Sequence, residues 1–228
     1  MAVIETQNLT KIYNEDQVPV HALNGVDLTI EKGEFTSIVG PSGSGKTTLL
    51  NLIGGLDTPT EGKVWIQGTD LASLSENELI EFRLHHIGFV FQAYNLIPVL
   101  TAIENVSFIM QMQGMAASLY RDISQNLLEE VGLADKIDKR PSELSGGQQQ
   151  RVAVARALAS KPDFVLADEP TANLDSVSTA DLLDMMAELN QNEGMTFVFS
   201  THDQRVIDRA RRVITLVDGK IAEDERRE

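Results

Sequence analysis

The 228-residue chain carries 34 acidic and 19 basic side chains, and its net charge of −15 is opposite in sign to that of a surface built to bind nucleic-acid phosphates. The absence of cysteine excludes a disulfide scaffold, a thiol nucleophile and a cysteine-ligated zinc site. The chain has 42% apolar residues, its uncharged stretches, such as Ala93 to Ile103, lack the run of apolar residues that a membrane-spanning helix needs, and Met1 to Glu5 shows no signal-peptide pattern. The composition therefore indicates a globular chain that stays where it is made.

The first part of the chain reads as strands. Branched apolar residues in Val3 to Leu9, and the alternation of apolar and polar residues in Val26 to Ile30, predict a small, half-exposed sheet. Phe35 to Val39 is a short apolar strand that runs through a glycine-rich loop into a helix over Lys46 to Ile53. This segment is therefore expected to be strand, loop and helix.

The middle of the chain changes from strand to helix signals. Val64 to Ile66 and Ile87 to Phe91 are expected strands, and the capping-box pattern Ser75 to Glu78 opens a helix between them. From Ala93 to Leu144 helical signals dominate, which predicts an inserted helical subdomain. Within it, the segment Ser118 to Val131 places four apolar residues on one face: Ile123, Leu127, Leu128 and Val131.

The last third alternates buried strands with amphipathic helices, a pattern typical of a parallel α/β sheet. A helix over Gln148 to Ser160 comes first. The strands expected after it are Phe164 to Ala167, Thr196 to Ser200 and Arg212 to Val217, and the helices are Ser178 to Gln191 and Gln204 to Ala210. The fold class predicted is α/β with an antiparallel β subdomain and an inserted α-helical subdomain, in one unit over residues 1–228.

A phosphate-binding loop is the strongest motif. Gly40, Pro41, Ser42, Gly43, Ser44, Gly45, Lys46 and Thr47 match G-x-x-x-x-G-K-[ST] between a strand and a helix. The glycines let backbone N–H groups wrap a phosphate chain, and the helix directs its positive dipole end at the same charge. We expect Lys46 to reach the β- and γ-phosphates and Thr47 to offer its hydroxyl to Mg²⁺.

Two carboxylates follow the strand Phe164 to Ala167. Ligands of α/β sheets gather at the carboxyl ends of strands, so Asp168 and Glu169 are expected beside the phosphates. Asp168 would bind Mg²⁺, directly or through water, and Glu169 would accept a proton from the attacking water. Taken alone, the pair is equally compatible with a solvated turn. The phosphate loop makes the catalytic interpretation the better one.

Two polar residues follow other strands in the same way. The imidazole of His202 could contact the γ-phosphate and orient the water, although a single histidine is more often structural. Gln92 could bind Mg²⁺ through its side-chain carbonyl, a weak signal by itself. The other histidines are interpreted as surface residues: His21, His85 and His86.

A second glycine turn precedes the helix Gln148 to Ser160. Its residues are Ser145, Gly146, Gly147 and Gln148, and they repeat the logic of a helix N-terminus that binds an anion. Since the chain already has a phosphate loop, we interpret this turn as completing the site of another copy, with two chains enclosing two nucleotides head to tail. A glycine turn with no ligand is the alternative.

In this order, these elements resemble the ATP-binding subunits of ABC transporters over essentially the whole chain. Gly40 to Thr47 is similar to the Walker A loop, Phe164 to Glu169 to Walker B, and Ala172 to Asp175 to the D-loop. Gln92 resembles the Q-loop residue, Leu144 to Gln148 the signature motif and His202 the switch histidine. The resemblance implies a P-loop NTPase with a RecA-like core that binds ATP and Mg²⁺, with Tyr13 on the adenine and Thr48 beside the phosphates.

Four longer segments resemble the MacB/LolD group of macrolide-exporter and lipoprotein-releasing ATPases: Ser42 to Lys46, Gly54 to Thr60, Ile87 to Gln92 and Leu166 to Asp175. The resemblance implies a homodimer that pairs with an FtsX/MacB-like permease, in the cytoplasm at the inner face of a bacterial membrane. It also implies a core with β subdomain over 1–92 and 164–228, and a helical subdomain over 93–163. Ala172 and Thr47 depart from the commonest residues of the group but keep the needed groups.

The permease is expected to dock near Leu96 to Leu100, because the uncharged segment Ala93 to Ile103 directly follows Gln92 and could pass nucleotide state to a partner helix. Packing inside the helical subdomain is the alternative. That alternative is preferred for three nearby methionines: Met110, Met112 and Met115.

Two other functions share the same ATPase head. An FtsE-like regulatory subunit, which controls a periplasmic enzyme through an FtsX-type partner, remains open. A soluble DNA-repair ATPase of the ABC type is disfavoured by the net charge and by the short segment between Gln92 and Ser145, which leaves no room for a long coiled coil.

Overall fold

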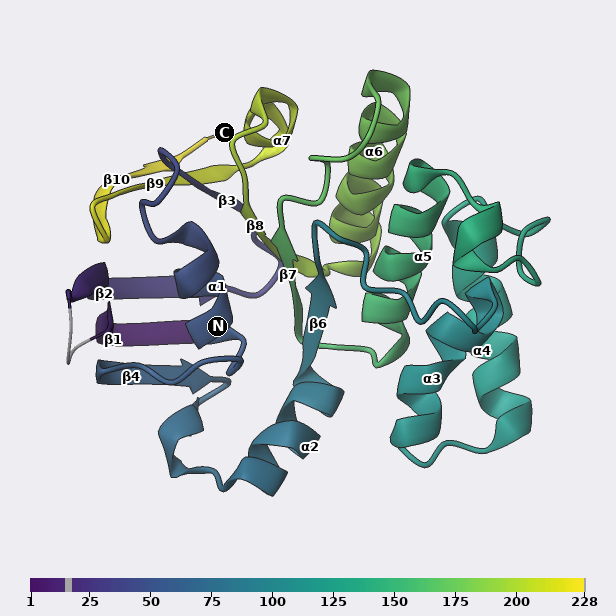
Figure 1. Cartoon of the computed structure of the whole chain (residues 1–228), viewed down its shortest axis with the longest axis horizontal. Coiled ribbons are helices and arrows are strands. Elements are labelled where there is room, and N and C mark those ends of the chain that lie inside the picture. The colour runs from purple at the N-terminus through teal and green to yellow at the C-terminus, as the bar shows by residue number, and fades with distance from the viewer. Residues whose placement is uncertain (15–17, 228) are drawn as a thin grey trace.

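The computed structural model describes residues 1–14 and 18–227, and within them the strands form two sheets (Figure 1). The smaller is antiparallel, in the order β2-β1-β4-β5. The larger has the order β10-β9-β3-β8-β7-β6 and is parallel except at β10. The strands are β1 (Ala2–Tyr13), β2 (Val20–Glu31), β3 (Phe35–Val39), β4 (Glu61–Ile66), β5 (Thr69–Asp70), β6 (Ile87–Val90), β7 (Phe164–Asp168), β8 (Thr196–Ser200), β9 (Arg212–Val217) and β10 (Lys220–Arg226).

Helices cover both faces of the larger sheet. α1 lies between the two sheets, where its Leu49 and Ile53 share a core with residues of β1, β2 and β4. The opposite face is covered by α5, α6 and α7. The α-helices are α1 (Lys46–Ile53), α2 (Glu76–His86), α3 (Ala102–Met112), α4 (Ala117–Glu130), α5 (Gly146–Ala159), α6 (Ser176–Glu193) and α7 (Gln204–Arg209). None of the helices in the described part of the chain is both long and apolar enough to cross a membrane.

Both faces of β7 are buried, which is why the central strands carry apolar residues on both faces. Leu166 faces the core shared with α1, whereas Val165 and Ala167 belong to the core under α5 and α6. Successive side chains of a strand point to opposite faces, so a strand covered on both faces has no position for a solvated residue. The predicted α/β class is confirmed, with antiparallel β10 as an addition at the sheet edge.

A third core joins α3, α4 and α5. The predicted apolar face of α4 lies in this core, with Leu128 and Val131 fully buried and Ile123 and Leu127 packed against them. The α5 helix serves two cores, because its Val152 packs in the helical lobe while its Val154 packs under the sheet. α5 therefore connects the lobe to the sheet.

Capping side chains set where several helices begin. The predicted capping box is present at α2, where Glu78 accepts from the backbone N–H of Ser75 at 2.9 Å. A box that was not predicted starts α3, with Thr101 as the cap. α5 begins at Gly146 and not at Gln148 as predicted, because Ser145 accepts from the Gln148 N–H and caps the helix two residues earlier.

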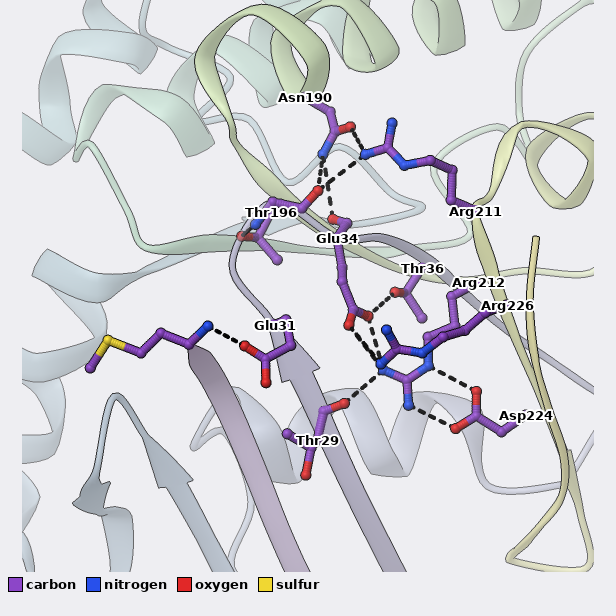
Figure 2. Close-up of polar contacts among 12 residues, drawn as sticks. Thr29, Glu31, Glu34, Thr36, Asn190, Thr196, Arg211, Arg212, Asp224 and Arg226 are labelled. Carbon is purple, nitrogen blue, oxygen red and sulfur yellow. Dashed lines mark hydrogen bonds and ion pairs between the residues drawn. The ribbon is translucent and has the colours of Figure 1, made fainter. Parts of the chain in front are cut away.

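Arg212 joins the two sheets (Figure 2). Its side chain is 8% exposed and donates to the carbonyl oxygen of Thr29 in β2 at 2.7 Å. The same guanidinium donates to Glu34 at 2.9 Å and binds Asp224 of β10 through two bonds of 2.7 and 2.8 Å. The hydrogen bonds to Asp224 and Glu34 raise the pKa of Arg212 against the opposing effect of burial. One cation thus satisfies three acceptors from separate segments.

Replacing Arg212 by methionine is expected to lower the free energy of unfolding by about 3 kcal/mol, because Glu34 stays largely buried after losing its main partner. Urea denaturation of the full chain measures the change. The matched control is Arg209→Met, which breaks a more exposed ion pair with Asp184 and should cost less than about 1 kcal/mol. Equal losses in the two variants would contradict the structural role of Arg212.

Candidate active site

The phosphate loop lies between β3 and α1, where the sequence places it. Gly40 and Gly45 have φ values of 149° and 103°. A Cβ on Gly40 would lie 2.1 Å from the Leu216 carbonyl oxygen, and one on Gly45 would lie 2.3 Å from that of Ala22, so neither position accepts a side chain. Glycine is required at both positions by the backbone conformation and by the space.

The N-terminus of α1 suits an anion. Its cap residue is Gly45, so no side chain caps the helix, and its first turn contains no acidic residue. By contrast, side-chain oxygens cap α2, α3, α5, α6 and α7. In addition, the hydroxyl of Ser44 is buried without a hydrogen-bond partner among the described residues. The loop therefore has donors that an anion could satisfy.

Lys46 and Thr47 of α1 reach the phosphate loop and the end of β7. Lys46 Nζ donates to the carbonyl oxygens of Gly40 and Pro41 at 2.9 and 3.1 Å, so its ammonium lies against the loop. The hydroxyl of Thr47 lies 3.2 and 3.1 Å from the two carboxylate oxygens of Asp168. Sequence analysis predicted these two as Mg²⁺ ligands, and the fold brings them into contact although they are 121 residues apart.

Glu169 directly follows β7 and is held by two groups from the end of β8. Its backbone adopts a φ of 45°, and its N–H donates to the Ser200 carbonyl oxygen at 2.8 Å. Thr201 Oγ1 donates to one carboxylate oxygen at 3.2 Å, and His202 Nδ1 lies 2.7 Å from the other. The carboxylate is 15% exposed and therefore has a fixed orientation. Such a group can accept a proton from a water bound beside it.

A second set of hydrogen bonds joins the segment after β7 to the segment after β8. Thr171, two residues after Glu169, donates to Asp203 at 2.9 Å. Asp203 also caps α7 and binds the guanidinium of Arg205. The segments that carry Glu169 and His202 therefore form one hydrogen-bonded unit. Thr171, Thr201 and Asp203 were not predicted, because only the parallel pairing of β7 with β8 makes these segments neighbours.

Gln92 lies at the same sheet edge, since β6 pairs in parallel with β7. Its backbone carbonyl oxygen accepts from Asn173 Nδ2 at 2.9 Å. After Ala93, both Tyr94 and Asn95 have positive φ, and Arg156 of α5 donates to their carbonyl oxygens at 2.9 and 2.5 Å. The segment after Gln92 is thereby fixed to α5, while the side chain of Gln92 is exposed.

The second glycine turn lies away from the first. Gly146 and Gly147 form the first turn of α5, which packs on the face of the sheet opposite α1 (Figure 1). A Cβ on Gly146 would lie 2.8 Å from the Tyr94 hydroxyl, and one on Gly147 would lie 2.8 Å from Ser178 Oγ. Ser145 caps this helix and is exposed. The turn is thus close to the segment after Gln92 and presents Ser145 outward.

Tyr13, the proposed base-stacking residue, ends β1. Its hydroxyl donates to Asp57 at 2.8 Å. Burial raises the pKa of Tyr13, and the Asp57 carboxylate raises it further. Lys11 binds Asp57 at 2.7 Å. Lys11 and Asp57 were not predicted, because no local pattern links a strand lysine to a residue 46 positions away.

A mainly apolar groove of about 460 Å³ lies between the sheet edge and the helical lobe. Its apolar lining includes Leu56, Ile80, Phe89, Phe91, Ile97, Phe108 and Met112. In the segment predicted to dock a partner, Ile97 lines the groove and Val99 is 73% exposed, whereas Leu96 packs on the helical core.

The methionines and histidines singled out in the sequence differ in how deeply they are buried. Met110 is fully buried and Met115 packs against the helical core, as preferred, but Met112 is exposed in the groove. His21 and His85 are exposed, as predicted. His86 is half-buried, stacks on Phe82 and lies 2.7 Å from Asp163, so it is more than a surface residue.

The family model, the relatives and the solved structure that match this chain agree with one another. The family model described as ABC transporter matches residues 23–172. The lipoprotein-releasing system ATP-binding protein LolD of Anaeromyxobacter dehalogenans is 48% identical over 97% of this chain and 93% of its own length. The macrolide export ATP-binding/permease protein MacB of Hyphomonas neptunium is 48% identical over 97% of this chain, which spans 34% of that longer protein. A dimeric ATP-binding cassette in a post-hydrolysis state, bound to ADP and Pi, superposes with a TM-score of 0.91 at 43% identity, covering 99% of both chains.

Asp203, which links the segments after β7 and β8, predicts that the stability of the fold depends on pH. The Arg205 guanidinium lowers the pKa of Asp203 from 3.8 to about 2; burial opposes this, and bonds from the Arg205 N–H and Thr171 add to it. The ionised form therefore stabilises the fold above pH 3.8, and this contribution is lost as the pH falls through about 2.

Asp203→Asn should lower the free energy of unfolding by roughly 1 kcal/mol at pH 7, because asparagine still caps α7 and solvent screening limits the loss of charge. The difference from the unmodified chain should shrink between about pH 4 and pH 2, measured by urea denaturation at each pH. The control Asp184→Asn, at an exposed ion pair, should change little at either pH. A pH-independent deficit in Asp203→Asn would contradict this assignment.

Proposed function

The chain belongs to the ABC transporter family and is an ATP-hydrolysing, nucleotide-binding subunit of the LolD/MacB type; from this premise we propose the role of each residue in the reaction. The observation that carries the proposal is the meeting of two contacts at one strand end. Asp168 contacts Thr47 of the phosphate-loop helix, and the next residue, Glu169, is held by Thr201 and His202. The sites for a phosphate chain and for a general base are therefore adjacent.

The phosphates of ATP bind the loop from Gly40 to Thr47. Backbone N–H groups and the uncapped N-terminus of α1 bind the oxygens, and Lys46 leaves its carbonyl partners to bind the β- and γ-phosphates. The Ser44 hydroxyl is a further donor or acceptor in this cradle. Tyr13 stacks on the adenine, and Thr48, in the first turn of α1, lies beside the phosphates.

Thr47 and Asp168 fit the requirements of Mg²⁺. They provide hydroxyl and carboxylate oxygens, and Mg²⁺ is usually bound by one or two carboxylates together with substrate phosphates. Gln92, at the same sheet edge, supplies a carbonyl oxygen. When bound, the ion offsets the negative charge that develops on the phosphate oxygens.

Hydrolysis is an in-line attack of water on the γ-phosphorus. Glu169 accepts a proton from the water, the new P–O bond forms, and the bond to the leaving ADP oxygen breaks. His202 keeps the Glu169 carboxylate in place with its Nδ1 and can contact the γ-phosphate with its other ring nitrogen. Lys46 offsets charge on the transferred group.

A second copy of the chain completes each site. Within one chain, α1 and α5 lie on opposite faces of the larger sheet, so Ser145 to Gln148 are suited to a nucleotide bound by another chain. The solved cassette that superposes on this chain is a dimer with ADP and Pi. Two copies arranged head to tail would enclose two ATP molecules, each between one phosphate loop and one Ser145 turn.

A membrane permease docks in the apolar groove. Ile97 and Asn95 line this groove a few residues after Gln92, and Arg156 lines it while holding the carbonyl oxygens of Tyr94 and Asn95. A helix seated in the groove would therefore contact the segment that reports on the nucleotide. This docking would hold the subunit at the inner face of the membrane.

Glu169→Gln should reduce ATP turnover at least about 100-fold, because an amide does not accept the proton, while ATP binding is retained and the ATP-bound dimer accumulates. Phosphate release and size-exclusion chromatography with ATP measure the two effects. The control Glu188→Gln, on the exposed side of α6, should behave as the unmodified chain does. Undiminished turnover in Glu169→Gln would remove this residue from its role.

The shared site is tested by mixing two inactive variants. Lys46→Met damages the phosphate loop, and Ser145→Asp keeps a capping residue on α5 but adds a negative charge beside the partner's γ-phosphate. Each variant alone should be inactive. An equimolar mixture should recover about a quarter of full activity, because half of the dimers are mixed and each has one intact site. A mixture as inactive as its components, with dimers present, would contradict the head-to-tail arrangement.

A further inference from the structure

Three side chains form a closed cluster beside the phosphate-loop helix. Lys11 and Tyr13 stand two positions apart on β1, and Asp57 lies just after α1. Lys11 Nζ donates to Asp57 Oδ1 at 2.7 Å, and the Tyr13 hydroxyl donates to Asp57 Oδ2 at 2.8 Å. The ammonium of Lys11 also lies 4.9 Å from the centre of the Tyr13 ring. Each member contacts both of the others.

This cluster is more constrained than a surface ion pair. The side chains of Lys11 and Asp57 are only 13% and 29% exposed. Lys11 also donates to the Thr58 carbonyl oxygen, and Asp57 accepts from the Thr58 N–H, both at 2.7 Å. Burial by itself would raise the pKa of Asp57, but the bonds from Lys11, Tyr13 and Thr58 lower it overall, so the carboxylate is ionised.

The contacts determine how the Tyr13 ring lies. Its hydroxyl is bonded to Asp57 just after the end of α1, so the ring edge is anchored to the segment that follows the phosphate-loop helix. Lys11 occupies one face of the ring. A planar group can therefore stack only on the other face, at a fixed distance from the loop.

We propose that Lys11 and Asp57 are positioning residues that hold Tyr13 in the orientation in which it stacks on the base of the nucleotide. The inference rests on the proposed function, in which Tyr13 contacts the adenine, and it adds the residues that prepare this contact in advance. An anchored ring loses little freedom when the base binds, so its stacking energy goes into affinity. In this arrangement neither Lys11 nor Asp57 touches the phosphates, so both affect only the contribution of the base to the affinity for ATP.

The test compares two ligands on the full chain: ATP, and inorganic tripolyphosphate, which has the phosphates without the base. Two variants loosen the cluster in different ways. Lys11→Met removes the cation from the ring face, and Tyr13→Phe keeps a stacking surface but removes the hydroxyl anchor. Each should weaken ATP binding about 10-fold and leave tripolyphosphate binding unchanged. In turnover assays KM for ATP should rise while kcat at saturating ATP is retained.

A second cluster in the same sheet provides a matched control. Lys63 on β4 pairs with Asp70 at 2.9 Å and lies 5.7 Å from the centre of the Trp65 ring. Lys63→Met therefore also removes a lysine ammonium from an aromatic ring, but at a position whose ion-pair partner lies in β5. It should leave the affinity for both ligands and the KM for ATP unchanged.

The outcomes separate failure of this inference from failure of the proposed function. If Tyr13→Ala weakens ATP binding but Lys11→Met and Tyr13→Phe bind ATP as the unmodified chain does, the positioning role is overturned and base stacking stands. Parallel losses for ATP and tripolyphosphate would also overturn it, because they indicate general damage to the loop. If Tyr13→Ala has no effect on ATP binding, base stacking fails and the inference fails with it. Lys46→Met should weaken both ligands, and if it weakens neither, the phosphate-loop assignment fails.

Discussion

The parallel pairing of β3, β8, β7 and β6 is the constraint on which the rest of the structure depends. Parallel strands end at the same sheet edge, so residues that are distant in sequence come together there. The phosphate loop leaves β3, Asp168 ends β7 and Glu169 follows it. Thr201 and His202 follow β8, and Gln92 follows β6. A shift of one residue in a single pair would exchange the two faces of that strand and separate Asp168 from Thr47.

Local patterns made most of the fold predictable. The strand, loop and helix around Gly40 to Lys46, the capping box at Ser75 and the apolar face of α4 all depend on neighbours in sequence. What was missed depends on contacts between segments that are distant in sequence. β10 (Lys220–Arg226) is mostly charged and exposed, and it forms a strand because β9 offers a partner, while Arg212 has its role only once β2 and β10 lie beside it.

The residues of the candidate site fall into the same two groups, those that a local motif marks and those that depend on contacts distant in sequence. Lys46, Thr47, Asp168 and Glu169 could be named from motifs, because phosphate chemistry needs those residue types at fixed spacing. The groups that orient them could not: Thr201 holds Glu169, Asp203 binds Thr171, and Lys11 and Asp57 surround Tyr13. These contacts span 32 to 46 residues, and no short pattern marks them. Sequence reasoning thus identifies the reactive groups more readily than the residues that position them.

The apolar groove has a consequence for how such subunits diversify. Its wall is built largely from α2, α3 and β6, whereas the phosphate loop and the carboxylates at the end of β7 belong to other segments. If the permease docks here as proposed, substitutions at Ile80, Phe108 or Met112 would alter which helix fits without altering any group assigned to catalysis. The same ATPase could in this way acquire a new membrane partner during evolution. Arg156 would then connect the variable wall of the groove to the constant segment after Gln92.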